Sequence, residues 1–85
     1  MTFMYKAQDP HFAERIRASF AQQQAMTLIG ASMAVVEPGY TEIHLPHKPE
    51  ITQQHGYIHG GVVGMIADSA AGYAASTLTA AEAGV

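Results

Sequence analysis

A single carboxylate lies inside an otherwise apolar stretch in the C-terminal third of the chain. The stretch runs from His55 to Ala75, HGYIHGGVVGMIADSAAGYAA, and Asp68 is its one acidic residue. An ionisable side chain among residues expected to be buried is costly unless it is paired or has a chemical role. A satisfied buried carboxylate is the alternative, but Asp68 is the best functional lead in the sequence.

Two glycines near the start of this stretch offer a second kind of chemistry. The first backbone N–H groups of a helix have no partner within the helix, and the helix dipole favours negative charge there. Gly60 and Gly61 leave these groups open to a ligand oxygen, which makes the helix start a candidate oxyanion or carbonyl-polarising site. A tight turn is the alternative role for the glycines. Neither G-x-G-x-x-G nor a Gly-Lys-Ser/Thr P-loop is present, which disfavours nucleotide phosphate binding.

The spacing between these two features predicts a dimer. Asp68 follows Gly60 by eight residues, which is roughly 12 Å along a helix that rises about 1.5 Å per residue. One substrate carbonyl cannot easily contact both the helix start and the Asp68 carboxylate of the same chain. Two antiparallel helices related by a two-fold axis would bring the start of one close to the middle of the other. A catalytic role for this stretch therefore requires sites between two copies.

Five histidines raise the question of a metal site. His44 and His47 straddle the end of a predicted strand, and His55 and His59 are separated by a glycine-containing loop, so neither pair shares a helical face. Zinc needs a defined shell of four ligands, and we predict no metal site. His59 differs from the others because it directly precedes the two glycines. It is expected either to donate to a substrate carbonyl or to order the loop.

A long helix is predicted to carry Asp68. Between Gly60 or Gly61 and about Thr77, apolar residues recur at spacings of three and four, as a buried helical face requires. This face consists of Val62, Val63, Ile66, Ala70, Tyr73 and Ala74. The other faces carry alanine and glycine, and a helix that is apolar nearly all round is usually enclosed. A sheet wrapped around the helix would account for this composition.

The N-terminal half predicts a second helix. Asp9 as N-cap and Pro10 at the first helical position start an amphipathic helix of three to four turns. Its packed face carries Phe12, Ile16 and Phe20.

A β-hairpin is predicted to follow. Residues 28–37 are rich in β-branched and small side chains and predict a strand. Pro38 and Gly39 fit the central positions of a type II turn. Residues 40–45 alternate as a half-buried antiparallel strand, with Tyr40, Glu42 and His44 on one face. Residues 48–54 form a polar connection to the glycines.

Size and composition limit the class of protein. The chain has 85 residues, is 48% hydrophobic and 13% charged, and carries a net charge of −3, which predicts one globular domain and no nucleic-acid partner. Without cysteine it has no thiol nucleophile, and no G-x-S-x-G motif surrounds Ser69 or Ser76. The N-terminus lacks the apolar region of a secretion signal, and no apolar run reaches the roughly 20 residues that span a membrane. We therefore expect a cytoplasmic protein that has no membrane contact.

With these residues in place, the chain resembles the PaaI-like (phenylacetic-acid-degradation) family of hotdog-fold acyl-CoA thioesterases. The most specific segment is Thr52 to Ala75, where His-Gly-Gly is followed on the same helix by Asp68. The resemblance implies an α+β hotdog fold, in which an antiparallel sheet wraps around one long central helix. It also implies homodimers or homotetramers with sites shared across the dimer interface, in agreement with the spacing argument.

The resemblance implies a role for each motif residue. Asp68 would be the catalytic carboxylate, acting as general base on water or as nucleophile on the thioester. Gly60 and Gly61 would polarise the thioester carbonyl, with assistance from His59. Family members commonly carry Asn six residues before the motif histidine, where this chain has Gln53, with the same amide on a longer side chain. The expected substrate-binding residues are Gly61, His55 and Val62.

Family members continue with several more strands, so residues 1–85 are expected to be a partial, truncated hotdog domain of helix, hairpin and central helix. The predicted function is hydrolysis of an acyl-CoA to free CoA and a carboxylic acid, without a cofactor. One alternative is a non-catalytic hotdog module that binds acyl-CoA or only oligomerises, and another is a metal-binding regulator. The sequence specifies neither the acyl group nor a dimer over a tetramer.

Overall fold

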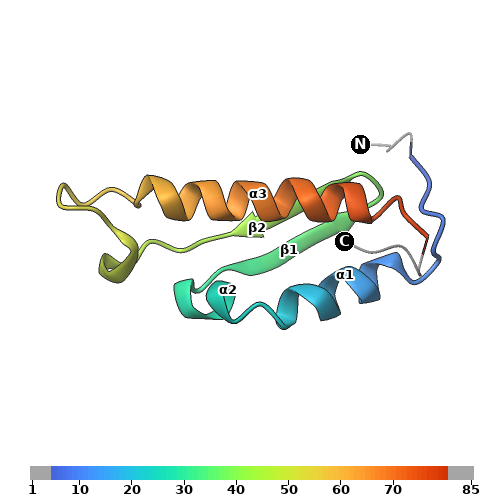
Figure 1. Ribbon diagram of the computed structural model, residues 1–85, viewed down its shortest axis with the longest axis horizontal. Coiled ribbons are helices and arrows are strands. Elements are labelled where there is room, and N and C mark those ends of the chain that lie inside the picture. Colours follow the sequence, from blue (N-terminus) through green and yellow to red (C-terminus); the bar gives the residue numbers. More distant parts are fainter. Residues whose placement is uncertain (1–4, 81–85) are drawn as a thin grey trace.

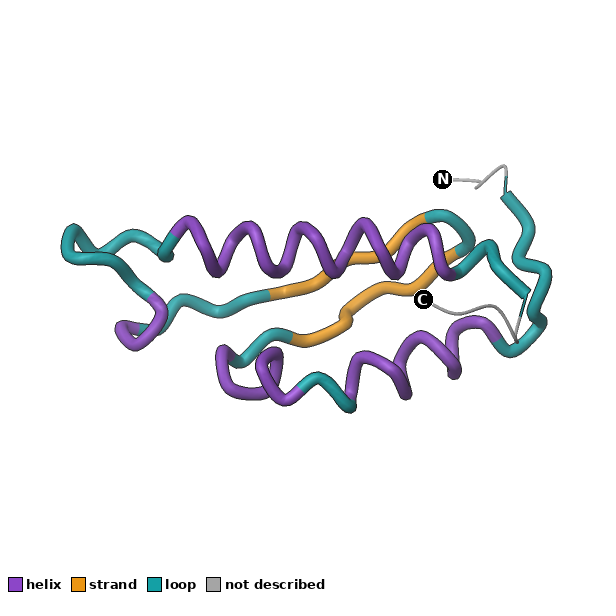
Figure 2. Tube along the Cα trace, in the orientation of Figure 1, coloured by secondary structure: helices purple, strands orange, loops and turns teal. Residues whose placement is uncertain are grey.

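The computed structural model describes residues 5–80. In chain order its elements are α1 (Phe12–Ala21), α2 (Gln24–Ile29), β1 (Ser32–Glu37), β2 (Tyr40–His44), the 3-10 helix η1 (Pro49–Ile51) and α3 (Gly60–Ser76). Helix α3 lies along β2, and α1 lies along β1 (Figure 1). Figure 2 shows the two strands between these helices, and the loop that leads into α3 at the end of the molecule opposite the turn between β1 and β2.

The predicted hairpin is present. Strands β1 and β2 pair antiparallel, and Glu37 faces Tyr40 across the turn. Gly39 has φ of +77°, the positive value that the third position of a type II turn requires. Tyr40, Glu42 and His44 share one face, as predicted: Tyr40 Oη donates to Glu42 Oε2 at 2.5 Å, and His44 Nε2 lies 3.2 Å from Glu42 Oε1. The hydrogen bond from Tyr40, followed by that from His44, holds the pKa of the Glu42 carboxyl below its usual range.

The first strand is shorter than predicted, because Leu28 and Ile29 end helix α2. The chain leaves this helix in a Schellman motif: the Gly30 N–H donates to Thr27 O at 3.2 Å, and the Ala31 N–H donates to Met26 O at 2.9 Å. The prediction that residues 28–31 belong to the strand is therefore wrong. The helix has only six residues, too few for its periodicity to outweigh the β-branched residues in the pattern.

Helix α1 begins at Phe12, two residues later than predicted, with His11 at the N-cap position. Asp9 instead orders the turn before the helix. Its Oδ1 accepts from the His11 N–H at 2.9 Å, and its carbonyl accepts from the Phe12 N–H at 3.1 Å. Ile16 and Phe20 are buried, as their spacing predicted.

The hydrophobic core lies between α1, α2, the hairpin, η1 and α3. Its buried members are Ile16, Phe20, Met26, Ile29, Met33, Ile51 and Tyr73. The rings of Phe20 and Tyr73 meet edge to face, with centroids 6.1 Å apart, and join α1 to α3. Ile51 comes from the predicted polar connection, where the single turn of η1 places one apolar side chain in the core.

Arg15 ties α1 to the C-terminal end of α3. Its guanidinium donates to Ser76 O at 2.9 Å, to Ser76 Oγ at 3.1 Å and to Thr79 O at 3.3 Å, while Nε contacts Asp9 Oδ2 at 3.0 Å. A cation is favourable at the negative end of the helix dipole, where the last carbonyl groups lack partners. The ends of α1 and α3 are therefore fixed relative to each other.

Within the described residues, α3 is covered on one face only. Tyr73 and Ser76 are buried, and Val62, Met65 and Ile66 pack against the core. The opposite face is exposed and consists of Val63, Gly64, Ala67, Asp68, Ala71, Gly72 and Ala75. The radius of gyration is 14.1 Å, against about 12 Å for a compact domain of this length. The predicted enclosure of α3, including the burial of Val63, is therefore not achieved by these residues, because two strands are too narrow to surround a helix.

Candidate active site

His59 caps the start of α3 with its own side chain. Its Nδ1 accepts a hydrogen bond from the Gly61 N–H at 2.9 Å, and its carbonyl accepts from the Val62 N–H at 3.0 Å. Its backbone N–H donates to Ile51 O at 2.9 Å, which fixes the residue from the opposite side. The expectation that the Gly61 N–H is open to a ligand is thus wrong in this structure, because the imidazole occupies it.

The same hydrogen bond determines what His59 can offer a ligand. A ring nitrogen that accepts a hydrogen bond carries no proton, so the neutral imidazole carries its proton on Nε2. The ring is exposed, so Nε2–H is a donor on the surface beside the helix start. Two roles were predicted for His59, ordering of the loop before the helix and donation to a substrate carbonyl. In the structure its side chain orders the helix start, and the Nε2–H of this tautomer can still donate to a substrate carbonyl.

Gly60 provides a second donor at the helix start. Across residues 5–80, no hydrogen bond is formed by its N–H. A Cβ built at Gly60 would meet no atom within 4 Å, so the backbone can be approached from solvent. The N–H of Gly60 and the Nε2–H of His59 are therefore the two donors that the helix start presents.

Gln53 and His55 shape the loop before α3. The Gln53 side-chain oxygen accepts from the His55 N–H at 2.5 Å, and the Gln53 carbonyl accepts from the Gly56 N–H at 3.0 Å. The Gln53 N–H donates to Tyr57 O at 2.8 Å, which closes the loop. The amide oxygen of Gln53 is thus used inside the loop, and its NH₂ group is the part left to face a substrate.

A cavity of about 380 Å³ opens beside the helix start, which we call the helix-start cavity. Its lining residues are Leu28, Ile29, Lys48, Glu50, Ile51, Thr52, His59 and Val62. Two predicted site residues, His59 and Val62, therefore meet in one cavity.

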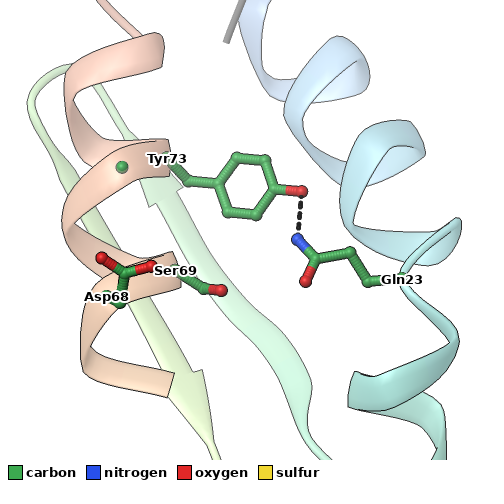
Figure 3. A pocket seen from close by; sticks show the side chains of 5 residues that line it. Gln23, Asp68, Ser69 and Tyr73 are labelled. Atoms are coloured by element: carbon green, nitrogen blue, oxygen red, sulfur yellow. Dashed lines mark hydrogen bonds between the residues drawn. The ribbon is translucent and has the colours of Figure 1, made fainter. Parts of the chain in front are cut away.

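Asp68 lies in a different and smaller cavity of about 180 Å³, the Asp68 cavity, lined by Gln23, Asp68, Ser69, Gly72 and Tyr73 (Figure 3). Tyr73 Oη accepts from Gln23 Nε2 at 2.6 Å and lies 3.0 Å from Ser19 Oγ. Asp68 itself is exposed, so the inference that it is buried fails for the single chain. The two cavities share no lining residue, which agrees with the predicted separation of Asp68 from the helix start.

Two lining residues, Gln23 and Leu28, were missed from the sequence. Gln23 was not distinguished from Gln22 and Gln24, because only the break between α1 and α2 turns it toward Tyr73. Leu28 was assigned to a strand, and its position on α2 places it in the helix-start cavity. No local signal in the sequence marks either residue.

The other histidines make local contacts. His44 pairs with Glu42, and His47 Nε2 donates to Gly56 O at 3.0 Å. Residues 5–80 contain no group of three or more His, Cys, Asp or Glu side chains placed to hold a metal ion. No helix in that part of the chain is long and apolar enough to cross a membrane.

Comparison with known proteins gives one informative match. No family model and no curated protein sequence matches the chain. The crystal structure of a thioesterase family protein from Silicibacter pomeroyi superposes with a TM-score of 0.79 and 42% sequence identity. The predicted resemblance to the thioesterase family is confirmed. The match covers 81% of this chain and 51% of that protein, so the chain spans about half of its length. The helix, hairpin and long helix are those of a hotdog thioesterase fold, as predicted.

Proposed function

We propose that this chain hydrolyses acyl-CoA thioesters at sites shared between two copies. The observation that carries the proposal is that α3 presents two donors at its start and an exposed carboxylate, Asp68, further along. The chain that carries them is 42% identical to a thioesterase family protein. In this proposal, residues 1–85 are the N-terminal portion of a PaaI-like hotdog domain. The protein acts in the cytoplasm as a homodimer or homotetramer and needs no cofactor.

The exposed face of α3 supports close approach by a second copy. Gly64 and Gly72 lie on this face and Gly60 starts the helix, and a Cβ at any of these glycines would meet no atom of the described chain within 4 Å. None of the three has a positive φ, so neither backbone conformation nor packing within the chain requires glycine there. Small residues let two helices approach closely, and an antiparallel pair would place the start of one α3 beside Asp68 of the other.

The proposed reaction uses one group from each copy. Gly60 N–H and His59 Nε2–H of one copy bind the thioester oxygen and stabilise the negative charge that develops on it. Asp68 of the other copy takes a proton from water as the water oxygen bonds to the carbonyl carbon. The C–S bond then breaks, the thiolate of CoA receives the proton from Asp68, and the carboxylic acid is released. Attack by Asp68 itself, followed by hydrolysis of the anhydride, is the variant in which it acts as nucleophile. The NH₂ group of Gln53 orients the water or the acyl group.

Release of CoA thiol from a panel of acyl-CoA substrates tests the activity, with Asp68→Asn beside the wild type. We expect turnover to be lost in this variant while the melting temperature is unchanged, because Asp68 is exposed. Full turnover by the folded variant would remove Asp68 from the mechanism.

Mixing two inactive variants tests whether the site is shared. Asp68→Asn keeps an intact helix start, and a variant changed at His59 keeps an intact Asp68. An equal mixture of exchanging dimers forms one intact site in half of its molecules, so about a quarter of wild-type turnover returns. No recovery after verified exchange of chains would place the whole site within one chain.

A non-catalytic acyl-CoA-binding module is the second candidate. The observation that favours it is that the described chain keeps Asp68 and the helix start in separate cavities and spans half of its thioesterase neighbour. Saturable acyl-CoA binding by a cooperatively folded sample that releases no CoA would support this candidate over the enzyme.

A further inference from the structure

The helix-start cavity has a feature that catalysis at His59 and Gly60 does not explain. Four of its lining residues are apolar, Leu28, Ile29, Ile51 and Val62, and they come from α2, η1 and α3. Its lining also includes the capping residue His59. We propose that this cavity takes the aliphatic acyl chain of the substrate and that Leu28 is a residue that determines the preference for chain length. The proposal rests on the function proposed above.

The volumes favour this cavity over the one at Asp68. Pockets that bind small molecules typically enclose about 300–1,000 Å³. The helix-start cavity, at about 380 Å³, falls within this range, and the Asp68 cavity, at about 180 Å³, falls below it. The lining of the Asp68 cavity includes no aliphatic side chain. The helix-start cavity has four aliphatic side chains beside the polar residues Lys48, Glu50, Thr52 and His59, so it offers an alkyl chain an apolar wall.

The arrangement of the lining matches a ligand with one polar end and one apolar end. His59 joins the cavity to the donors at the start of α3, where the thioester carbonyl is proposed to bind. Beyond it, the apolar walls would receive the carbons that follow the carbonyl. The proposed occupant is therefore an acyl chain rather than a second protein segment, because the cavity begins at His59, beside the proposed reaction centre.

Of the apolar residues that line the helix-start cavity, Leu28 is the least buried within the chain. Its side chain is 77% exposed, whereas Ile29 and Ile51 are each 7% exposed and belong to the core. Lys48 fixes the backbone behind it, since Nζ donates to Leu28 O at 2.9 Å. An apolar side chain held at the wall of a cavity, with little role in the core, is positioned to contact a ligand.

The test measures binding of non-hydrolysable thioether analogues of acetyl-, butyryl-, hexanoyl- and octanoyl-CoA by titration calorimetry. In the wild type, affinity should rise by up to about fourfold for each methylene that enters the cavity, the factor that corresponds to burial of one CH₂. Leu28→Asp should remove most of this increase and leave the affinity for the acetyl analogue unchanged. Leu28→Ala should reduce the increase to an intermediate value. Thr27→Asp is the matched control, because it places the same charge on an exposed neighbour that does not line this cavity.

Each outcome decides the proposal. An affinity that is independent of chain length in the wild type, or an equal effect of Leu28→Asp and Thr27→Asp, would overturn it. So would a change of oligomeric state in Leu28→Asp with equal weakening of all four analogues, because that result would assign the surface to a second copy. The proposed hydrolysis fails separately, if wild type and Asp68→Asn release CoA at the same rate, and the binding series remains decisive in that case.

Discussion

The backbone N–H of Gly61 donates to Nδ1 of His59 across the first turn of α3, at 2.9 Å. This contact makes one side chain responsible for two properties, the stability of the helix start and the donor that Nε2 presents. The two properties can be separated by choosing what replaces the imidazole.

Replacement of His59 by alanine and by serine should give different results. His59→Ala removes the cap and should lower the free energy of unfolding by about 1 kcal/mol, as for other N-caps. His59→Ser supplies another cap acceptor and should keep the stability near that of the wild type. Both variants lack Nε2–H, so CoA release should fall by about 10²–10³-fold, the usual loss for one oxyanion donor. Thermal melts and the thiol assay measure the two effects, and undiminished turnover by His59→Ser would restrict His59 to capping.

Gly60→Ala should increase stability and decrease activity. A Cβ at this position has open space and the residue has no positive φ, so alanine should stabilise the chain by about 0.4–1 kcal/mol through the unfolded state. The added methyl group would obstruct substrate at the Gly60 N–H and lower turnover. Gly56→Ala is the contrasting variant. A Cβ at Gly56 would also meet no atom within 4 Å, but Gly56 has a φ of +87°, so this variant should be less stable than the wild type. Denaturant melts together with CoA release test the pair, and an active Gly60→Ala would exclude close approach of substrate at this residue.

Tyr73→Phe should loosen the contact between α1 and α3. Tyr73 is 5% exposed, and its hydroxyl contacts Gln23 Nε2 and Ser19 Oγ. Loss of the hydroxyl should lower the free energy of unfolding by about 1–2 kcal/mol, because the partly buried side chains of Gln23 and Ser19 would lose a hydrogen-bond partner. Tyr57→Phe, at a side chain that is 73% exposed, is the control and should be neutral. Equal stability of both variants in chemical denaturation would show that the hydroxyl network does not hold the helices together.

The free energy of unfolding should decrease at acidic pH, because the Asp9 carboxylate becomes protonated. The hydrogen bond from the His11 N–H, followed by that from Arg15, holds the pKa of the Asp9 carboxyl below its usual range. A carboxyl whose pKa is lower in the folded state contributes stability above its unfolded pKa, about 3.9, and that contribution is lost as the pH falls through the depressed folded pKa. Melting temperatures between neutral pH and strong acid should therefore fall more steeply for the wild type than for Asp9→Asn. Glu14→Gln, at an exposed carboxylate of α1, should follow the wild type, and parallel curves for all three proteins would contradict the role of Asp9.

Contacts within a few residues made much of the architecture predictable. Pro38 and Gly39 specify the turn through the φ values that each residue allows, so the hairpin was found at its correct position. Residues 28–31 were misassigned because the ending of α2 depends on Met26 and Ile29 packing into a core that also contains Ile51 and Tyr73. That core is formed by residues far apart in the sequence, and no local pattern reports it.

The sequence by itself predicted that a long helix starts at Gly60 or Gly61, that His59 and Asp68 stand at its start and its middle, and that one substrate carbonyl cannot easily contact both in a single chain. These conclusions follow from helical periodicity and rise, which are properties of the local backbone. Only the tertiary structure decided that His59 occupies the Gly61 N–H, that Asp68 is exposed and that Leu28 lines the cavity beside the helix start. Side-chain rotamers and the faces left uncovered depend on which distant elements pack together, and that information is not contained in the spacing of residues along the chain.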